Sequence, residues 1–219
     1  AEQRMIGMLE YTFWPNGFDQ YGHSSRFDAL IYLKESPLFP ELIDLIDYTF
    51  DKIDFVDKPL NISPDSPLSL HCRYTMKQLQ MGLGYKKPQT QQAGVKYFAD
   101  KKTDVFFITL NKSDKDYSPD TMYDDYSINE NLFHWQSQNS TSPESKVGQR
   151  YINHKRTGNR ILLFVREYKS EYGMASPYTC LGFADYVTHE GSRPMSIVLK
   201  MHDPIPAKFL AKSNKLAVS

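Results

Sequence analysis

Aromatic and acidic side chains alternate over residues 117–126, and a second aromatic stretch follows at residues 132–138. A nucleobase that is flipped out of a duplex needs two aromatic faces around its ring and hydrogen-bond partners for its Watson–Crick edge. A carboxylate can accept a hydrogen bond from the N4 amine of cytosine, whereas adenine is usually bound by Asn or Gln. Tyr123 and Trp135 are therefore candidates for the two faces, and Asp124 or Asp125 for the acceptor.

The same stretch also has a purely structural interpretation. In that interpretation Tyr126, Phe133 and Trp135 belong to the core of a β-barrel, and the acids lie on a solvated turn. Residue types and spacing alone leave both interpretations open.

Common catalytic motifs are missing from the sequence. It contains no G-x-x-x-x-G-K-[ST] phosphate loop, which excludes ATP hydrolysis by that route, and no H-E-x-x-H or G-x-S-x-G motif. The zinc deaminase pattern is also absent. The histidines at positions 23, 71, 134, 154, 189 and 202 include no pair at the i, i+4 spacing of metal ligands. These observations favour a binding module over an enzyme, with no metal and no cofactor.

Charge is divided unevenly along a chain whose net charge is zero. Residues 1–84 carry 7 Lys/Arg against 12 Asp/Glu, and residues 85–219 carry 19 against 14. Residues 145–170 include seven basic residues and a single acid, Glu167. A basic patch of this kind suits a nucleic-acid backbone because neutralised phosphates release their counterions, although a solvated surface without a partner would have the same composition. The candidate phosphate contacts are Lys146, Arg150, Lys155, Arg156, Arg160 and Arg193.

Helical spacing dominates the first quarter of the chain. It predicts helices over residues 2–12, 26–34 and 41–53, the second of them capped by Ser24 or Ser25. The Pro- and Ser-rich residues 58–67 are typical of a linker. The sequence thus predicts a small acidic helical segment over residues 1–65.

Strand patterns dominate the rest of the chain, residues 66–219. Continuous apolar runs at residues 104–111 and 161–168 predict strands buried on both faces. Further strands are expected at residues 132–136, 179–187 and 195–201, and helices at residues 75–84 and 207–216. Many strands with few helices indicate an α+β chain whose second part is a small barrel or sandwich.

Composition indicates a folded protein that does not span a membrane. Hydrophobic residues make up 40% and aromatic residues 14% of the 219 residues. The longest apolar run, Ile161 to Val165, is far below the roughly 20 residues that cross a bilayer. With no secretory leader and only Cys72 and Cys180, which lack C-x-x-C spacing, we expect two buried thiols in a cytoplasmic protein.

Six short motifs carry a resemblance to a known family. They are LH-RYT at residues 70–75, TLNKS at 109–113, LFHWQSQ at 132–138, GQRYINH at 148–154, LLFVREY at 162–168 and HEGSRPMSI at 189–197. Together they resemble a C-terminal domain of unknown function that follows a phospholipase-D-type nuclease and a superfamily II helicase in many bacterial proteins. The resemblance covers essentially the whole chain.

This resemblance implies the target-recognition part of an ATP-dependent, modification-dependent (type IV) restriction enzyme. Residues 1–65 would connect the helicase to the target-recognition domain. Residues 66–219 would form that domain, a barrel similar to the SET-and-RING-associated (SRA) domain of the PUA-like group. The implied partners are duplex DNA with 5-methylcytosine or 5-hydroxymethylcytosine and the upstream helicase and nuclease of the same polypeptide. Cleavage and ATP hydrolysis would belong to those upstream parts.

The resemblance also implies a base pocket. SRA domains stack the flipped base between two tyrosines about twelve residues apart, with an acid three residues after the first. Tyr123 and Trp135 match that separation, but the third position after Tyr123 is Tyr126 rather than an acid. Tyr123, Asp125 and Trp135 are thus the expected base contacts, with Asp124, Tyr126 and Ser137 beside them.

Two other functions remain as alternatives. One is an interaction or dimerisation module without base readout, in which the acidic helices and the pair Phe13-Trp14 form the interface. The other is a reader of RNA or of N6-methyladenine. Its amide partners would be Asn129, Asn131, Gln136 and Gln138.

Overall fold

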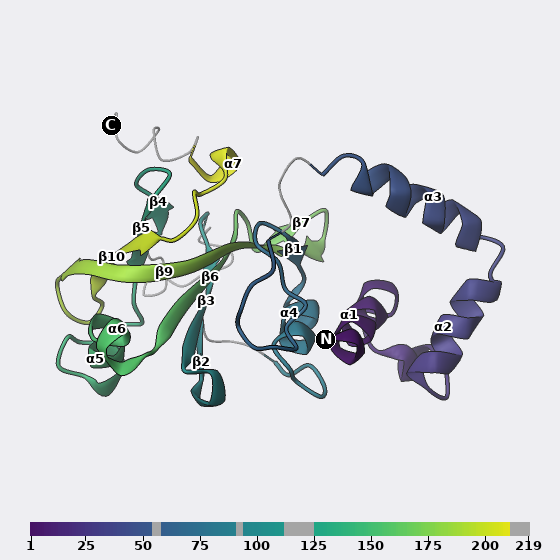
Figure 1. Ribbon diagram of the computed structural model, residues 1–219, viewed down its shortest axis with the longest axis horizontal. Coiled ribbons are helices and arrows are strands. Elements are labelled where there is room, and N and C mark those ends of the chain that lie inside the picture. Colours follow the sequence, from purple (N-terminus) through teal and green to yellow (C-terminus); the bar gives the residue numbers. More distant parts are fainter. Residues whose placement is uncertain (54–57, 91–93, 112–124, 211–219) are drawn as a thin grey trace. The chain divides into compact units, whose positions relative to one another are not determined.

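The computed structural model describes residues 1–53, 58–90, 94–111 and 125–210 (Figure 1). It contains N-terminal helices and a mixed β-sheet, so the predicted α+β class is confirmed. The chain divides into two compact units. The first consists of Ala1–Leu68 with Lys77–Gln89, and the second of Ser69–Met76 with Thr90–Ser219. The division of the chain at residue 65 into coupling segment and recognition domain stays a prediction.

The first unit is helical. Its elements are α1 (Glu2–Phe13), the 3-10 helix η1 (Phe18–Tyr21), α2 (Arg26–Glu35), α3 (Phe39–Phe50) and most of α4 (Met76–Gly82). Ser25 caps α2 by accepting a hydrogen bond from the Asp28 N–H, as the sequence predicts. The Arg26 guanidinium donates to the buried Glu10 carboxylate over 2.6 Å and joins α2 to α1. The helices expected at residues 2–12, 26–34 and 41–53 are therefore present with small shifts at their ends.

The second unit is built on a mixed sheet. Its strands are β1 (Arg73–Tyr74), β2 (Val95–Phe98), β3 (Thr103–Thr109), β4 (Tyr126–Ser127), β5 (Leu132–Gln136), β6 (Arg160–Arg166), β9 (Tyr178–Glu190) and β10 (Ser196–Met201). Among the described residues these eight strands follow the order β2-β3-β6-β9-β10-β5-β4, with β1 paired to β9. β3 and β6 pair in parallel, so the chain must cross over between them.

Shorter elements complete the second unit. The crossover before β6 contains α5 (Lys146–Ile152) and α6 (His154–Thr157). A separate two-stranded ribbon consists of β7 (Ser170–Glu171) and β8 (Met174–Ala175). The 3-10 helix η2 (Ala99–Lys101) links β2 to β3, and α7 (Ala207–Leu210) follows β10. The helix expected at residues 207–216 is thus observed at its start, and its remainder lies outside the described residues.

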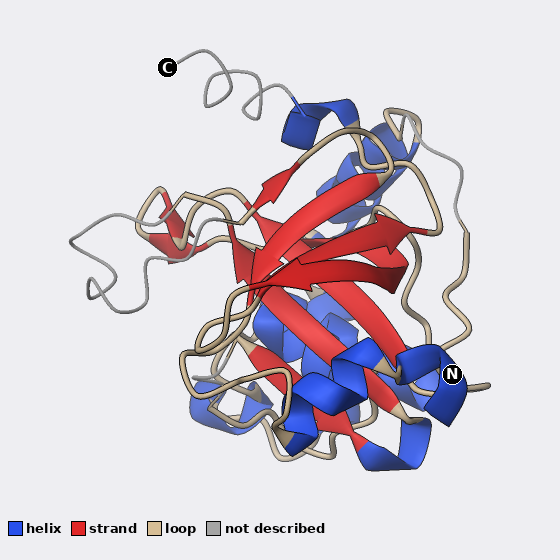
Figure 2. Ribbon diagram, turned by 90° about the vertical axis from the view of Figure 1, so that its left-hand side faces the viewer, coloured by secondary structure: helices blue, strands red, loops and turns tan. Residues whose placement is uncertain are grey.

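The expected closed barrel is not observed. In the described part of the chain the sheet ends at β2 on one side and at β4 on the other, and these two strands do not pair. The sheet is strongly twisted instead, as Figure 2 shows. Register shifts between Leu163 and Phe164 and between Val198 and Leu199 contribute bends. Apolar runs predict which strands are buried but say nothing about edge pairing, so closure could not be predicted from them.

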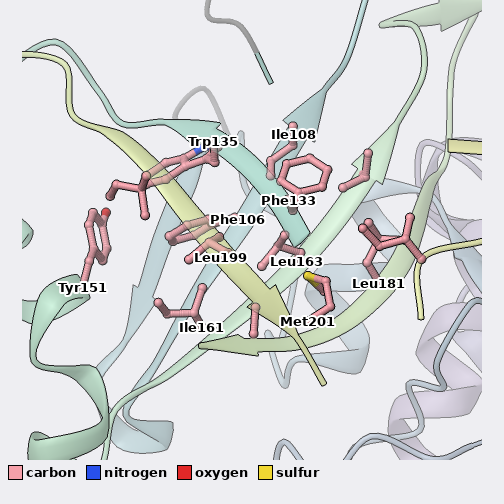
Figure 3. Packing of buried hydrophobic residues seen from close by; sticks show 14 of the residues in the cluster. Phe106, Ile108, Phe133, Trp135, Tyr151, Ile161, Leu163, Leu181, Leu199 and Met201 are labelled. Carbon is pink, nitrogen blue, oxygen red and sulfur yellow. The ribbon is translucent and has the colours of Figure 1, made fainter. Parts of the chain in front are cut away.

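The core of the second unit lies between strands that are distant in sequence (Figure 3). All residues of β3 are buried, and so are the five central residues of β6, which confirms two strands covered on both faces. β5 instead alternates, with Phe133 and Trp135 buried and His134 half-buried. Alternation in a strand places neighbours on opposite faces, so His134 points away from the core that holds Trp135.

Two further expectations concern the thiols and the membrane. Both cysteines are free thiols, but only Cys180 is buried, while Cys72 is half-buried. Burial raises the pKa of the Cys180 thiol, which keeps it protonated. Within the described ranges, no helix has the length and apolar character needed to cross a membrane.

Candidate nucleic-acid interface

The predicted base contacts are distributed between the sheet core, its edge and a stretch that is not described. Tyr123 and Asp124 lie outside the described residues. Trp135 is 5% exposed and belongs to the core, where its ring lies 4.1 Å from that of Phe106 and 5.6 Å from that of Tyr151. Figure 3 shows Tyr151 reaching from α5 toward this group. A base could stack on Trp135 only if this packing opened.

Asp125 is a buried carboxylate at the end of β5. It is 8% exposed, and its Oδ1 accepts a hydrogen bond of 2.9 Å from the backbone N–H of Gln136. The Gln136 side chain in turn donates to the Ser196 hydroxyl at the start of β10, over 3.4 Å. The carboxylate therefore lies where β5 ends and β10 begins, and we call this the β5–β10 end.

Ser137 at the same end is a structural residue. Its hydroxyl accepts from the Met195 N–H over 2.9 Å and donates to the Gln138 carbonyl over 3.2 Å. Its own N–H donates to the Met195 carbonyl. Because the hydroxyl both donates and accepts in these contacts, Ser137 holds the strand ends together.

Tyr126 provides an aromatic ring next to the carboxylate. It starts the edge strand β4, pairs with His134 across the strands, and stacks on the His134 ring with centroids 4.7 Å apart. Both side chains are half-buried rather than part of the core. Sequence analysis named Tyr126 but missed His134, although the alternation of β5 places His134 on the face opposite Trp135.

A buried hydroxyl without a partner lies near Trp135. The Tyr151 Oη has no hydrogen-bond partner among the described residues, and burial raises the pKa of this phenol well above its usual value. Unpaired buried polar groups are uncommon in folded proteins. Sequence analysis missed Tyr151, because a lone tyrosine in a short helix gives no signal.

The predicted phosphate contacts separate into paired and unpaired cations. Arg150 forms a bidentate ion pair with the buried Asp104 carboxylate, both contacts at 2.7 Å, and lies over the Tyr97 ring. Arg160 lies over the Phe183 ring and donates to the Lys101 carbonyl. These two guanidiniums are integrated into the fold.

The remaining cations are exposed. Lys155 pairs with Asp185 over 2.8 Å but remains largely exposed. Lys146 and Arg156 are exposed and have no side-chain partner within the described ranges. Arg193 is also exposed and interacts with the exposed Glu144 carboxylate. Lys146, Arg156 and Arg193 are therefore the cations most available to an external phosphate.

Local packing joins the β9–β10 turn, which carries the exposed Arg193, to the start of α5, which carries the exposed Lys146. The Arg193 N–H donates to the Thr141 carbonyl over 3.1 Å, which ties the β9–β10 turn to the segment before α5. Ser145 caps α5 by accepting from the Gly148 N–H. A Cβ at Gly148 would lie 2.0 Å from the Ser142 carbonyl oxygen, so only glycine allows this close approach. Both residues are thus on backbone segments that pack together beside the start of β10.

A neutral histidine anchors α6, which carries Arg156. The Tyr186 N–H donates to His154 Nε2 over 3.0 Å, so the ring proton is on Nδ1, which faces the Asn159 carbonyl at 3.3 Å. Burial lowers the pKa of His154 and favours this neutral form. His154 is therefore a structural link between α6 and β9 rather than a catalytic base.

No group of His, Cys, Asp and Glu side chains in the described residues is arranged to hold a metal ion. The Asp185 carboxylate contacts both the Lys155 ammonium and the His202 ring, whose Nε2 lies 3.1 Å from it. That cluster is an ion-pair network on the surface.

Comparison with known families gives one match. The sequence model of a domain of unknown function, DUF3427, matches residues 68–212. No curated protein matches the sequence.

Proposed function

Because the chain belongs to the DUF3427 family of domains of unknown function, which specifies no activity, we propose its function from the site: it is a DNA target-recognition module that binds modified cytosine. In this proposal 5-methylcytosine or 5-hydroxymethylcytosine is flipped out of the duplex and held at the β5–β10 end. The resemblance to the target-recognition region of the restriction enzyme SauUSI supports the same assignment. The helicase and nuclease of such an enzyme would lie elsewhere in the polypeptide and supply ATP hydrolysis and cleavage.

The observation that supports the proposal is the buried Asp125 carboxylate at the β5–β10 end, where the turn that carries the exposed Arg193 also leads into β10. A carboxylate at this position can accept a hydrogen bond from the N4 amine of cytosine. The Gln136 N–H binds Oδ1 and fixes the orientation of the group. Lys146 and Arg193, on the segments beside the start of β10, would hold the phosphates that flank a flipped nucleotide.

The aromatic contacts to the base differ from those expected from the sequence, because Trp135 is packed in the core. Trp135 supports the pocket from the core side, because its ring is packed against Phe106 and Tyr151. Tyr126, next to Asp125 and stacked on His134, becomes a stacking candidate together with Tyr123. A base stacked on an aromatic ring gains about 1–3 kcal/mol, which offsets the few kcal/mol of unstacking that flipping costs.

Selection of the modified base needs an apolar niche at cytosine C5. Burial of one methyl group contributes about 1 kcal/mol. Methyl contact alone thus gives only about fivefold preference, since 1.4 kcal/mol corresponds to a factor of ten. A larger preference would require contacts that exclude unmodified cytosine.

The proposal is tested by binding of this chain to otherwise identical duplexes that contain cytosine, 5-methylcytosine or N6-methyladenine. We expect the 5-methylcytosine duplex to bind most tightly, by roughly fivefold over the unmodified duplex. Fluorescence anisotropy at two salt concentrations measures these affinities. Equal affinity for all three duplexes would contradict base readout, preference for N6-methyladenine would support the adenine reader, and no DNA binding would favour an interaction module.

A second prediction concerns the exposed cation on α6. Arg156→Ala should weaken binding to modified and unmodified duplexes by similar factors and reduce the salt slope by about one unit, because a phosphate contact carries no sequence information. Lys34→Ala, which removes an exposed cation of α2, is the matched control and should leave the slope unchanged. An unchanged slope for Arg156→Ala would place the DNA surface away from α6.

A further inference from the structure

The two cysteines of the chain lie opposite each other on neighbouring segments of the second unit. β1 and β9 are antiparallel, and Arg73 is the cross-strand partner of Thr179. One further step along this ladder sets Cys72 opposite Cys180, and the Cys180 N–H donates to the Cys72 carbonyl over 3.0 Å. Both cysteines belong to the same compact unit, so their mutual position is set within it.

The backbone next to this pair forms a β-bulge. The His71 N–H donates to the Cys180 carbonyl over 2.9 Å, so His71 and Cys72 together oppose the single residue Cys180. His71 has a φ of 63°, in the left-handed region that residues other than glycine rarely adopt. Hydrogen bonds from both segments therefore fix Cys180 opposite Cys72.

The two thiols are directed to the same face of the sheet, because directly opposed residues of antiparallel strands share a face. Tyr74 lies two residues from Cys72 and is on that face as well. Burial raises the pKa of the Tyr74 phenol most, and the nearby Cys72 and Cys180 thiols raise it further. The Tyr74 hydroxyl is thus close to both sulfurs, which places the sulfurs close to each other.

The register of the pair suits a reversible bond. The Cβ atoms of directly opposed residues lie about 4.5–5.5 Å apart in an antiparallel sheet. A disulfide needs about 3.5–4.5 Å between its Cβ atoms, so the two segments would approach each other by about 1 Å. A disulfide formed with such a distortion is more easily reduced than a relaxed one.

The two thiols differ in access to an oxidant. Cys72 is half-buried, whereas Cys180 is fully buried. Burial also raises the pKa of the Cys180 thiol, and the thiolate is the reactive form of cysteine. An oxidant therefore reacts with Cys72 first, and Cys180 is the thiol that resolves the product.

We propose that Cys72 and Cys180 form a site of reversible oxidative modification, at which a peroxide converts the two thiols into a disulfide. One peroxide oxygen oxidises the Cys72 thiol to a sulfenic acid, and the other leaves as water. The Cys180 sulfur then attacks the sulfenic sulfur, and the S–O bond breaks. The departing hydroxyl takes up the Cys180 proton and leaves as water. A reducing dithiol restores both thiols by exchange and becomes a disulfide itself.

The bond would attach one segment of the chain covalently to the sheet. Ser69–Met76 is the stretch of the second unit that lies in sequence between two stretches of the first unit. It contains β1, which has two residues. Oxidation would thus reinforce a short strand pairing where the chain enters and leaves the second unit, and it is independent of DNA binding at the β5–β10 end.

The test treats the reduced full chain with hydrogen peroxide. We expect both thiols to be lost together, as counted with a maleimide label after unfolding. Mass spectrometry of a digest made without reductant should show a peptide pair that joins Cys72 to Cys180 and lacks two hydrogen atoms. Dithiothreitol should restore both thiols.

Variants of the chain separate the two steps. Cys180→Ser should stop the reaction at the Cys72 sulfenic acid, which dimedone captures. In Cys72→Ser, the Cys180 thiol should be oxidised at least about tenfold more slowly than Cys72 in the unmodified chain, because it is buried and protonated. Circular dichroism shows whether each variant keeps its fold.

A matched control keeps two thiols but moves one of them. The double variant Cys180→Ser with Ser192→Cys places the second thiol at an exposed position beyond the far end of β9. It should form no bond to Cys72 within the chain. Equal bond formation in this variant would contradict the proposal, and so would two thiols that stay reduced in the unmodified chain or a disulfide that forms only between chains.

Discussion

Arg150→Ala is expected to lower the free energy of unfolding by about 3–5 kcal/mol, the range for removing one partner of a buried ion pair. The Asp104 side chain is 1% exposed, and both of its oxygens accept from the Arg150 guanidinium at 2.7 Å. Without Arg150 the carboxylate would be buried without its charged partner, and burial already raises the pKa of Asp104. Urea denaturation followed by circular dichroism measures the loss.

A double variant separates the ion pair from packing. Replacing both residues by apolar side chains of similar size, Asp104→Leu with Arg150→Met, should recover most of the stability because no unpaired charge remains. Arg150→Lys should recover only part, since an ammonium cannot form the bidentate contact. If Arg150→Ala is as stable as the unmodified chain and weakens DNA binding with a reduced salt slope, Arg150 is a phosphate contact as the sequence suggested.

Asp125→Asn is expected to weaken binding of the 5-methylcytosine duplex by about 1–3 kcal/mol, the cost of leaving a buried polar group mismatched. The asparagine oxygen can still accept from the Gln136 N–H, so the local structure should persist. Its amide NH₂ would then face the cytosine amine, donor against donor. Comparison of affinities for modified and unmodified duplexes measures the effect, together with a melting temperature to show that the fold is intact.

Two companion variants make the Asp125 test specific. Glu144→Gln removes an exposed carboxylate beside Arg193 at the same end of the sheet and should leave the preference for modified cytosine unchanged. Asp124→Asn examines the neighbouring carboxylate. If Asp124→Asn weakens binding of the 5-methylcytosine duplex and Asp125→Asn does not, Asp124 is the carboxylate that contacts the base. If Asp124→Asn, Asp125→Asn and Tyr123→Ala all keep the full preference for modified cytosine, the base binds elsewhere.

Local pattern was sufficient for the elements that position the site. The spacing of apolar residues predicted α1, α2 and α3, and the apolar runs predicted β3 and β6 as strands buried on both faces. Ser25 was identified as the cap of α2 because a serine before an apolar-periodic run can accept from the first free backbone N–H groups. These properties depend on residues a few positions apart, so the sequence displays them directly.

The direction of Trp135 shows where local pattern fails. Twelve residues separate it from Tyr123, which suits a base sandwich, but the alternation of β5 and the contacts with Phe106 and Tyr151 place its ring in the core. Alternation predicts two faces for a strand, and only packing against other strands decides which face is inside.

The residues alone predicted the α+β class, most helix and strand positions, the acidic first part and the basic second part. Contacts in the folded chain were needed to show that the sheet stays open between β2 and β4 in the described residues, and to show which cations are exposed. Arg150 and Arg156 look alike in sequence. Arg150 pairs with Asp104, which is 46 residues away along the chain, whereas Arg156 is exposed. Strand closure and ion pairing both join residues distant along the chain, and such contacts leave no trace in local periodicity or charge counts.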